Sequence, residues 1–256
     1  MSEVLLKAEN VSIVFGGLKA VSDFDFYINK GELIGLIGPN GAGKTTAFNL
    51  ITGVYQPTTG NIEFAGKSIV GKKPYEITQR GIARTFQNIR LFSELTVLDN
   101  VKIAFHSHVK YGLAETVFRV GRYFSEEKQI EEESMKLLKI FKLDGHAYDR
   151  AKNLPYGAQR RLEIARALAA KPKLLLLDEP AAGMNPQETK ELMEMISWIR
   201  KEFGLTVLLI EHDMSLVMGI CERIYVLEYG MIIANGTPKE IQENPEVIRA
   251  YLGGEA

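Results

Sequence analysis

A glycine-rich stretch at residues 38–45 constrains this chain more than any other feature. An apolar run over residues 33–37, short enough for one buried strand, leads into Gly-Pro-Asn-Gly-Ala-Gly-Lys-Thr, and a helix-competent segment follows from Thr46. The stretch fits the P-loop pattern residue for residue. A plain glycine-rich turn between a strand and a helix is the alternative, but the order of strand, loop, Lys-Thr and helix favours the P-loop.

Each residue type in this loop has a task in phosphate binding. Gly38, Gly41 and Gly43 allow backbone conformations that a Cβ would block, so successive N–H groups can converge on one phosphate. The helix that follows adds the positive end of its dipole. Lys44 supplies a mobile charge for the β/γ-phosphates, and the Thr45 hydroxyl can complete a Mg²⁺ shell. We therefore predict that the chain binds a nucleoside triphosphate. The predicted phosphate-binding set is Gly38, Pro39, Asn40, Gly41, Ala42, Gly43, Lys44, Thr45 and Thr46.

A second apolar run ends in two carboxylates. Residues 174–177 are four leucines in a row, which indicates a strand buried on both faces of a parallel sheet. Asp178 and Glu179 follow at its carboxyl end, where open α/β sheets bind ligands. Asp178 can hold Mg²⁺ through water, and Glu179 can polarise an attacking water. A pair of carboxylates that caps the next helix is the alternative.

Three further side chains stand at the ends of predicted strands. Phe15 precedes a Gly pair and could stack on an adenine ring or pack in the core. Gln87 ends a predicted strand over 81–87, where most glutamines are solvated surface. His212 follows the strand predicted over 205–210, which we expect beside the strand that ends at Asp178. His212 could thus reach a γ-phosphate, although a single histidine at a strand end is most often structural.

Two parts of the chain differ in the secondary structure that their sequence pattern predicts. Short strands and turn clusters over residues 4–37 predict a small antiparallel sheet beside the nucleotide core. Apolar residues recur at helical spacing within residues 88–161, so we expect a helical lobe inserted in one α/β domain. The aromatic-rich segment 111–124 is either a surface hairpin or a docking element. The helix start at 155–157 is either a second anion site or the entry of a plain core helix.

Composition excludes several function classes. The 256 residues carry a net charge of −1 and no long basic run, so there is no bulk attraction to nucleic acid or anionic lipid. Cys221 is the only cysteine, which excludes a disulfide framework and fits a reducing compartment. The N-terminus lacks a signal-peptide apolar region, and the apolar runs are too short to span a bilayer. A membrane role therefore requires a partner.

In this order, the motifs resemble the ATP-binding subunit of an ABC transporter over essentially the whole chain. The resemblance implies that residues 38–45 are the Walker A motif, that 174–178 are the Walker B motif and that 154–158 occupy the signature position. It makes Glu179 the catalytic base and His212 the switch histidine. Gln87 corresponds to the Q-loop glutamine. The implied catalytic residues are Lys44, Glu179 and His212, and the implied Mg²⁺ ligands are Thr45, Gln87 and Asp178.

The resemblance also implies a site shared by two chains. In the family, two subunits sandwich two ATP molecules, each held between one Walker A motif and the other subunit's signature. Tyr156 and Gly157 are then expected to contact the ATP of the partner subunit, whereas Phe15 stacks on the adenine of the chain's own ATP and Asp178 reaches the metal of that ATP. The implied cofactors are ATP and Mg²⁺.

The implied architecture is one ABC ATPase domain over residues 1–256 with a RecA-like P-loop NTPase core. The core and its antiparallel β subdomain are expected over 1–88 and 162–256, and an inserted α-helical subdomain over 89–161 carries the signature motif. The implied partners are a second ATPase subunit, either a non-identical paralogue or a second copy, the transmembrane permeases, and indirectly a substrate-binding protein. Nucleic acid is not expected as a partner. The location implied is the cytoplasmic face of the inner or plasma membrane.

Longer runs resemble one branch of the family, the ATPases of branched-chain amino acid importers. These runs are residues 160–168, 179–186, 211–218 and the tail 234–253. Urea and amide importers have very similar subunits and remain the alternative. A soluble ABC ATPase that acts on nucleic acid is less consistent, because such proteins usually carry two ATPase units or a long coiled coil. A GTPase is disfavoured because the guanine-reading Asn-Lys-x-Asp pattern is absent.

The chain departs from the family pattern at the signature and the D-loop. Pro155 replaces the signature serine, so a hydroxyl and a backbone N–H that the family offers to the γ-phosphate are both missing. Tyr156 and Ala158 replace a glycine and the glutamine, and Asn185 replaces the D-loop aspartate. A groove over 87–97 with several apolar side chains either receives a helix of the membrane subunit or packs between the lobes.

Overall fold

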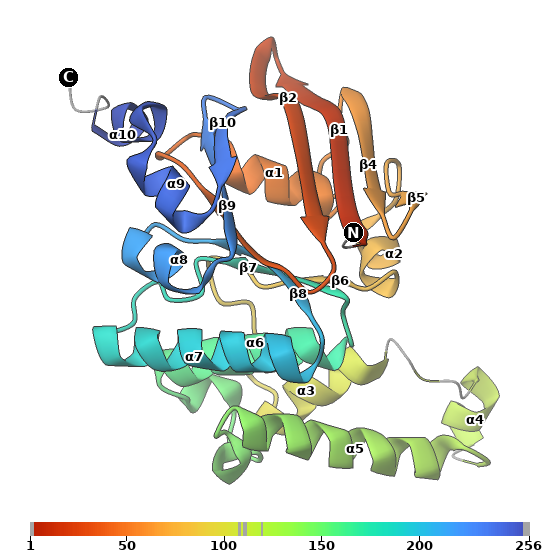
Figure 1. Ribbon diagram of the computed structural model, residues 1–256. Helices are drawn as coiled ribbons and strands as arrows, with labels where there is room; N and C mark the ends of the chain where they lie inside the picture. The colour runs from red at the N-terminus through yellow and green to blue at the C-terminus, as the bar shows by residue number, and fades with distance from the viewer. Residues whose placement is uncertain (1–2, 107–108, 110–111, 119, 253–256) are drawn as a thin grey trace.

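The computed structural model describes residues 3–106, 109, 112–118 and 120–252. Two sheets form the upper part of the molecule in Figure 1, and most of the long helices lie below them. The strands are β1 Val4–Phe15, β2 Leu18–Asn29, β3 Leu33–Ile37, β4 Thr59–Phe64, β5 Lys67–Ser68, β6 Ile82–Arg84, β7 Leu174–Asp178, β8 Thr206–Ile210, β9 Arg223–Glu228 and β10 Met231–Gly236. The α-helices are α1 Lys44–Ile51, α2 Pro74–Gln79, α3 Val97–Phe105, α4 Leu113–Phe118, α5 Tyr123–Ile140, α6 Tyr156–Ala169, α7 Pro186–Glu202, α8 Met214–Ile220, α9 Pro238–Glu243 and α10 Pro245–Leu252.

The larger sheet is mainly parallel and has the strand order β10-β9-β3-β8-β7-β6. Strand β3 pairs in parallel with β8 and β9, and β7 pairs in parallel with β8 and β6, so the carboxyl ends of these strands share one edge. Only β10 runs antiparallel, as the second strand of a hairpin with β9. The smaller sheet is antiparallel, with the order β2-β1-β4-β5. Both sheets confirm the α/β fold with an antiparallel subdomain.

The core lies on both faces of the large sheet. All five residues of β7 are buried, and successive side chains alternate between two clusters: Leu174 and Leu176 face the side with α1 and the small sheet, whereas Leu175 and Leu177 face the long helices. Figure 1 shows α1 between the two sheets and α6, α7 and α3 beneath the large one. A strand buried on both faces is what the apolar run predicted.

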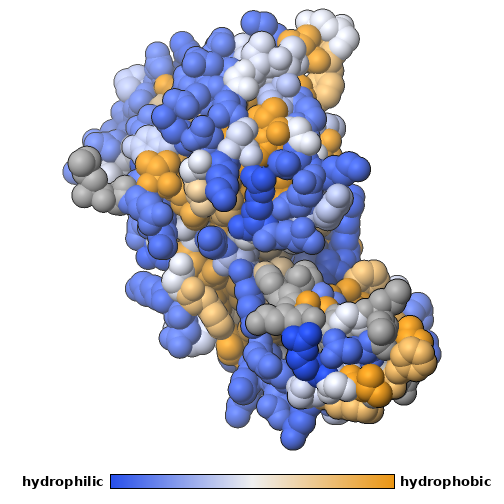
Figure 2. All heavy atoms as spheres, turned by 90° about the vertical axis from the view of Figure 1, so that its right-hand side faces the viewer, coloured by the Kyte–Doolittle hydropathy of each residue, from blue (hydrophilic) through white to orange (hydrophobic). Residues whose placement is uncertain are grey.

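Segment 111–124, within which residues 111 and 119 lie outside the description, contains helix α4 and the start of α5 rather than a hairpin of strands. Figure 2 shows apolar side chains gathered on the lower lobe that holds these helices. The strongly exposed ones in this segment are Val117, Phe118, Val120 and Phe124. A docking role for this segment stays a prediction.

No helix in the described part of the chain is long and apolar enough to cross a bilayer. Cys221 is buried, and this burial raises the pKa of its thiol to about 12. The thiol is therefore protonated and unreactive at neutral pH.

Candidate nucleotide-binding site

The loop between β3 and α1 needs glycine where its backbone meets β9. A Cβ on Gly38 would lie 2.0 Å from the carbonyl oxygen of Leu227, and φ of Gly38 is +151°. Gly43 is the N-cap of α1 in a left-handed conformation, with φ of 103°. The loop therefore passes close to a neighbouring strand and then opens into a helix N-terminus, which is the geometry that collects backbone N–H groups around a phosphate.

Lys44 is folded back onto this loop. Its Nζ donates hydrogen bonds to the carbonyl oxygens of Gly38 at 2.6 Å and Pro39 at 3.0 Å, and the residue is buried. Burial lowers the pKa of Lys44, while the charges of Glu179 and Asp178 oppose that shift. Thr45 is exposed at the start of α1.

A hollow of about 420 Å³ lies beside the loop. The loop side of the hollow is formed by residues 39–42, and the opposite side by the β9–β10 turn and helix α10. On this second side, Arg249 of α10 lies 3.6 Å from Glu228 at the end of β9.

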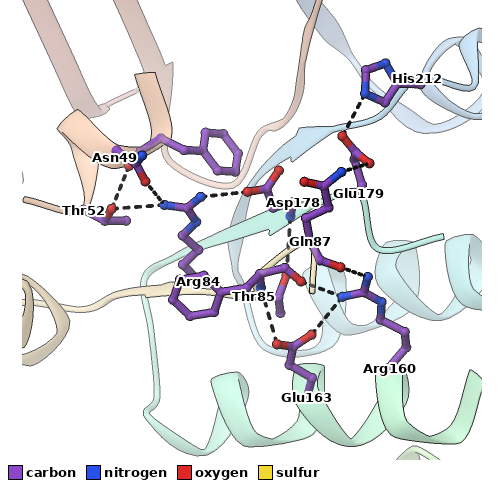
Figure 3. Close-up of polar contacts among 12 residues, drawn as sticks. Asn49, Thr52, Arg84, Thr85, Gln87, Arg160, Glu163, Asp178, Glu179 and His212 are labelled. Atoms are coloured by element: carbon purple, nitrogen blue, oxygen red, sulfur yellow. Dashed lines mark hydrogen bonds and ion pairs between the residues drawn. The ribbon is translucent and has the colours of Figure 1, made fainter. Parts of the chain in front are cut away.

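Glu179 lies between two polar partners, as Figure 3 shows. Gln87 Nε2 donates to Glu179 Oε2 at 3.0 Å, and His212 Nε2 lies 2.7 Å from Glu179 Oε1. The Glu179 N–H donates to the carbonyl of Ile210, which fixes the end of β7 to the end of β8. Glu179 has φ of 48°, a conformation that non-glycine residues adopt mainly where the surroundings hold them. The structure thus joins three residues that the sequence placed at separate strand ends.

Strand β6 ends at Arg84, three residues earlier than the sequence pattern suggested, so Gln87 lies in the loop that follows. Arg84 was missed by the sequence analysis, yet it makes the closest contact to Asp178: its Nη2 lies 2.7 Å from Asp178 Oδ2. The Asp178 N–H also points to Thr85 Oγ1 at 3.4 Å. The sequence offered no signal for this pair, because its members are 94 residues apart and meet only through the β6–β7 pairing.

A buried ion pair on α6 holds the loop that carries Gln87. Arg160 and Glu163 are each 1% exposed, and Arg160 Nη1 lies 3.0 Å from Glu163 Oε2. Arg160 also donates to the carbonyls of Phe86 and Gln87, and Glu163 Oε1 accepts from the N–H groups of Phe86 at 3.4 Å and Arg90 at 3.3 Å. Sequence reasoning missed both residues; their i, i+3 spacing on a helix was the one available signal.

Glu211 is a further buried carboxylate that the sequence analysis did not single out. Its Oε1 accepts a hydrogen bond from the Ala181 N–H at 2.9 Å, and burial raises the pKa of its carboxyl group. It ties the loop after Glu179 to the end of β8. Its neighbour His212 is thereby placed next to Glu179.

Residues 154–158, the predicted signature, lead into the start of α6 and lie near residues 182–185, the predicted D-loop. A Cβ on Gly183 would lie 3.2 Å from the Tyr156 ring, and one on Gly157 would lie 3.1 Å from a carboxylate oxygen of Glu188. Pro155 is the N-cap of α6 and makes no side-chain cap hydrogen bond. Asn185 accepts from the Glu188 N–H at 2.9 Å, so the D-loop asparagine serves as the N-cap of α7.

Phe15 is 44% exposed at the end of β1, and its ring meets that of Tyr55 edge-on at 5.1 Å. The core alternative is therefore wrong for this side chain, and its ring is accessible to a ligand. Stacking on adenine stays a prediction.

The donor set fits a hard divalent cation. Asp178 has a second carboxylate oxygen beside the one that meets Arg84, and Thr45 offers an exposed hydroxyl. Oxygen ligands of this kind, together with phosphate and water, suit Mg²⁺. Gln87 points its amide nitrogen at Glu179, so its own oxygen stays free of that bond. Within the described residues, no cluster of three or more His, Cys, Asp or Glu side chains could hold a metal ion.

The family model for the ABC transporter matches residues 21–182. This chain belongs to the ABC transporter family. A second model, for the branched-chain amino acid ATP-binding cassette transporter, matches residues 231–256, the end of the chain that includes β10, α9 and α10.

Named relatives cover the chain from end to end. LivG of Salmonella typhimurium, a high-affinity branched-chain amino acid transport ATP-binding protein, is 47% identical over 99% of both chains. BraF of Pseudomonas aeruginosa, which carries the same description, is 44% identical over 99% of both. These full-length matches place the sequence in the branch of the ABC family to which its motifs pointed.

Solved structures of ABC cassettes share this fold. MJ1267, an ATP-binding cassette of an ABC transporter solved in its ADP conformation, is 32% identical with a TM-score of 0.85, and the match covers 98% of this chain and 100% of that one. MJ0796, solved as a dimer in a post-hydrolysis state with ADP and phosphate, is 25% identical with a TM-score of 0.77 over 91% of this chain and 99% of that one. The ABC cassette is thus a P-loop NTPase fold with an added antiparallel sheet, as described above.

Proposed function

We propose that this ABC protein is the ATP-binding and hydrolysing subunit that energises an importer of branched-chain amino acids. The observation that carries the chemistry is the placement of Glu179: it stands at the end of β7, fixed by His212 and Gln87, on the same sheet edge as the loop with Lys44. The relatives LivG and BraF supply the substrate class.

The residues divide the reaction among them. The loop N–H groups and Lys44 bind the β- and γ-phosphates, and Lys44 exchanges its present carbonyl partners for phosphate oxygens. Glu179 accepts a hydrogen bond from the attacking water and orients it, while His212 stabilises charge on the γ-phosphate. Mg²⁺, bound through Thr45, Gln87 and Asp178, would add electrostatic stabilisation of the phosphate oxygens.

We propose that a second subunit completes the site. Tyr156 lies beside Gly183 of the predicted D-loop, and Gly157 lies beside Glu188 of α7; we propose that both serve the ATP of a partner. The dimer of MJ0796 with ADP and phosphate gives a precedent in a related cassette. Bound ATP would then join two subunits, and its hydrolysis would release them.

The permease would bind in the loop between β6 and α3. Leu91 packs against the core cluster, whereas Phe92 and Leu95 remain exposed. This mixture favours an external partner for the exposed pair over simple packing between lobes.

We further propose that residues 89–161 form the inserted helical subdomain and that 1–88 and 162–256 form the core. Binding to a permease would hold the subunit at the cytoplasmic face of the membrane.

Replacing Pro155 by serine tests the partner surface. We expect Pro155→Ser to strengthen MgATP-driven dimerisation several-fold, because serine restores a backbone N–H and an N-cap hydroxyl at the start of α6. Sedimentation velocity in a hydrolysis-deficient background measures the dimer affinity. Pro155→Ala is the matched control, since it restores the N–H alone. Equal dimer affinities for all three chains would argue against a weakened signature and against a non-identical ATPase as the preferred partner.

Transport itself tests the proposed function. The chain would be reconstituted in proteoliposomes with candidate partners: a second ATPase subunit, permeases and a binding protein. We expect ATP-dependent uptake of leucine that stops when Glu179 is replaced by Gln. Uptake of urea or an amide without leucine would instead favour the alternative importer class.

A further inference from the structure

The pair of Arg84 and Asp178 is the least expected feature of the site. Both side chains are nearly buried, at 8% and 5% exposure, and the guanidinium meets only one of the two carboxylate oxygens, Oδ2, at 2.7 Å. A guanidinium does not lose its proton in a protein. The Asp178 carboxylate, which would serve a metal ion, is therefore paired with a permanently charged group, as Figure 3 shows.

Other contacts keep this cation in place. Arg84 Nη1 donates to Asn49 Oδ1 of α1 at 2.6 Å and lies 3.5 Å from Oγ1 of Thr52, the C-cap residue of the same helix. The centre of the guanidinium lies 5.4 Å from the centroid of the Phe48 ring and 5.2 Å from that of Phe86. With partners on α1, β7 and two rings, Arg84 is fixed and cannot easily swing away when a metal arrives.

A second cation adds to this effect. Lys44 couples electrostatically to Asp178 and Glu179 from the loop side. Without nucleotide, the site therefore sets two cations against two carboxylates, and Glu179 is already engaged by Gln87 and His212. Because the two cations already balance the two carboxylates, a free divalent cation at the remaining Asp178 oxygen would enter a site without net negative charge. Nucleotide phosphates would supply the missing negative charge.

We propose that Arg84 is a positioning residue that keeps the affinity of Asp178 for a free divalent cation low, so that the metal enters only together with nucleotide phosphates. This inference rests on the proposed function of the site as a metal–nucleotide site. Arg84 holds one oxygen of Asp178 and leaves the other for the metal, and its charge makes metal binding conditional on the phosphates. After hydrolysis, the same charge favours loss of the metal together with the nucleotide.

Binding of Mn²⁺ to the nucleotide-free chain tests this, with free Mn²⁺ measured by electron paramagnetic resonance. We expect Arg84→Met to bind Mn²⁺ about tenfold more tightly than the wild type or more, because methionine fills the space between the rings without charge. Arg84→Lys should stay near the wild type, because it retains the charge. Arg90→Met is the matched control: Arg90 lies over the same Phe86 ring at 4.4 Å, and its removal should leave Mn²⁺ affinity unchanged.

A second readout covers the case in which Arg84→Met folds poorly. Arg84→Gln keeps a hydrogen-bonding group beside Asp178 and removes the charge, and Mn²⁺ alone should raise its melting temperature more than that of the wild type. Unchanged free-Mn²⁺ affinity in both neutral variants would overturn the inference. Saturating ADP should shrink the difference between wild type and variant; a difference that persists undiminished would also contradict it.

These outcomes are distinguishable from failure of the proposed function. If the wild type binds neither MnADP nor MgATP, the proposed nucleotide site is wrong. If the wild type binds both normally while the neutral variants gain no affinity for free Mn²⁺, only the proposed role of Arg84 is contradicted, and the proposed function is unaffected.

Discussion

Replacing Glu179 by glutamine should lower ATP hydrolysis to about one hundredth of the wild-type rate or less, while MgATP binding is retained. Glutamine fills the same volume and can still meet His212, now 2.7 Å from Glu179 Oε1, but it cannot polarise a water molecule as a carboxylate does. Because bound ATP is then not consumed, the variant should also accumulate as a dimer. Phosphate release and sedimentation measure the two effects.

Glu211→Gln is the control for this prediction. Glu211 follows the neighbouring strand and is buried, but it bonds the Ala181 N–H rather than facing Gln87. Its replacement should leave the rate within a few-fold of the wild type. A normal hydrolysis rate in Glu179→Gln, or an equal loss in both variants, would remove Glu179 from the role of base.

The largest effect on stability is expected at Arg160. Arg160→Met leaves Glu163 buried at 1% exposure without its partner, which should lower the free energy of unfolding by about 3–5 kcal/mol. The variant also frees the backbone of Phe86 and Gln87, to whose carbonyls Arg160 donates. Urea-induced unfolding, followed by circular dichroism, measures the loss.

The double variant Arg160→Met with Glu163→Leu separates the effect of the unpaired buried charge on stability from the effect of lost side-chain packing. Since it removes both charges and keeps apolar volume, it should recover much of the lost stability. It should not recover hydrolysis, because the loop that positions Gln87 against Glu179 stays unclamped. If Arg160→Met alone were as stable as the wild type, the ion pair would not be what fixes this loop to α6.

The parts of the fold that could be predicted are those specified by residues that lie close together along the chain. Four leucines before Asp178 specify a strand buried on both faces, and the glycines of residues 38–45 specify the loop, because each of these signals is complete within a few residues. The strand-end positions of Glu179 and His212 were also predictable. That Glu179 and His212 lie close together could also be predicted, because β7 and β8 were expected to lie side by side.

The parts that could not be predicted are charge pairs made across the fold. Arg84 lies 94 residues from Asp178, and nothing in its local sequence separates it from a solvated arginine. Arg160 and Glu163 sit on one helix at ordinary surface-pair spacing, and only tertiary packing shows that they are buried. A single sequence does not show which charged residues are buried. The charged residues that contact the predicted site residues are therefore visible only in the structure.

A calorimetric titration with MgATP measures nucleotide binding by the phosphate loop, on which the proposed roles of all the other site residues depend. We expect one ATP per chain for the wild type and loss of most binding in Lys44→Ala, because Lys44 is the one cation carried by the phosphate loop over residues 38–45. Circular dichroism would confirm that the variant is folded. No binding by the wild type, or binding undiminished in Lys44→Ala, would contradict ATP binding through Lys44 and the phosphate loop.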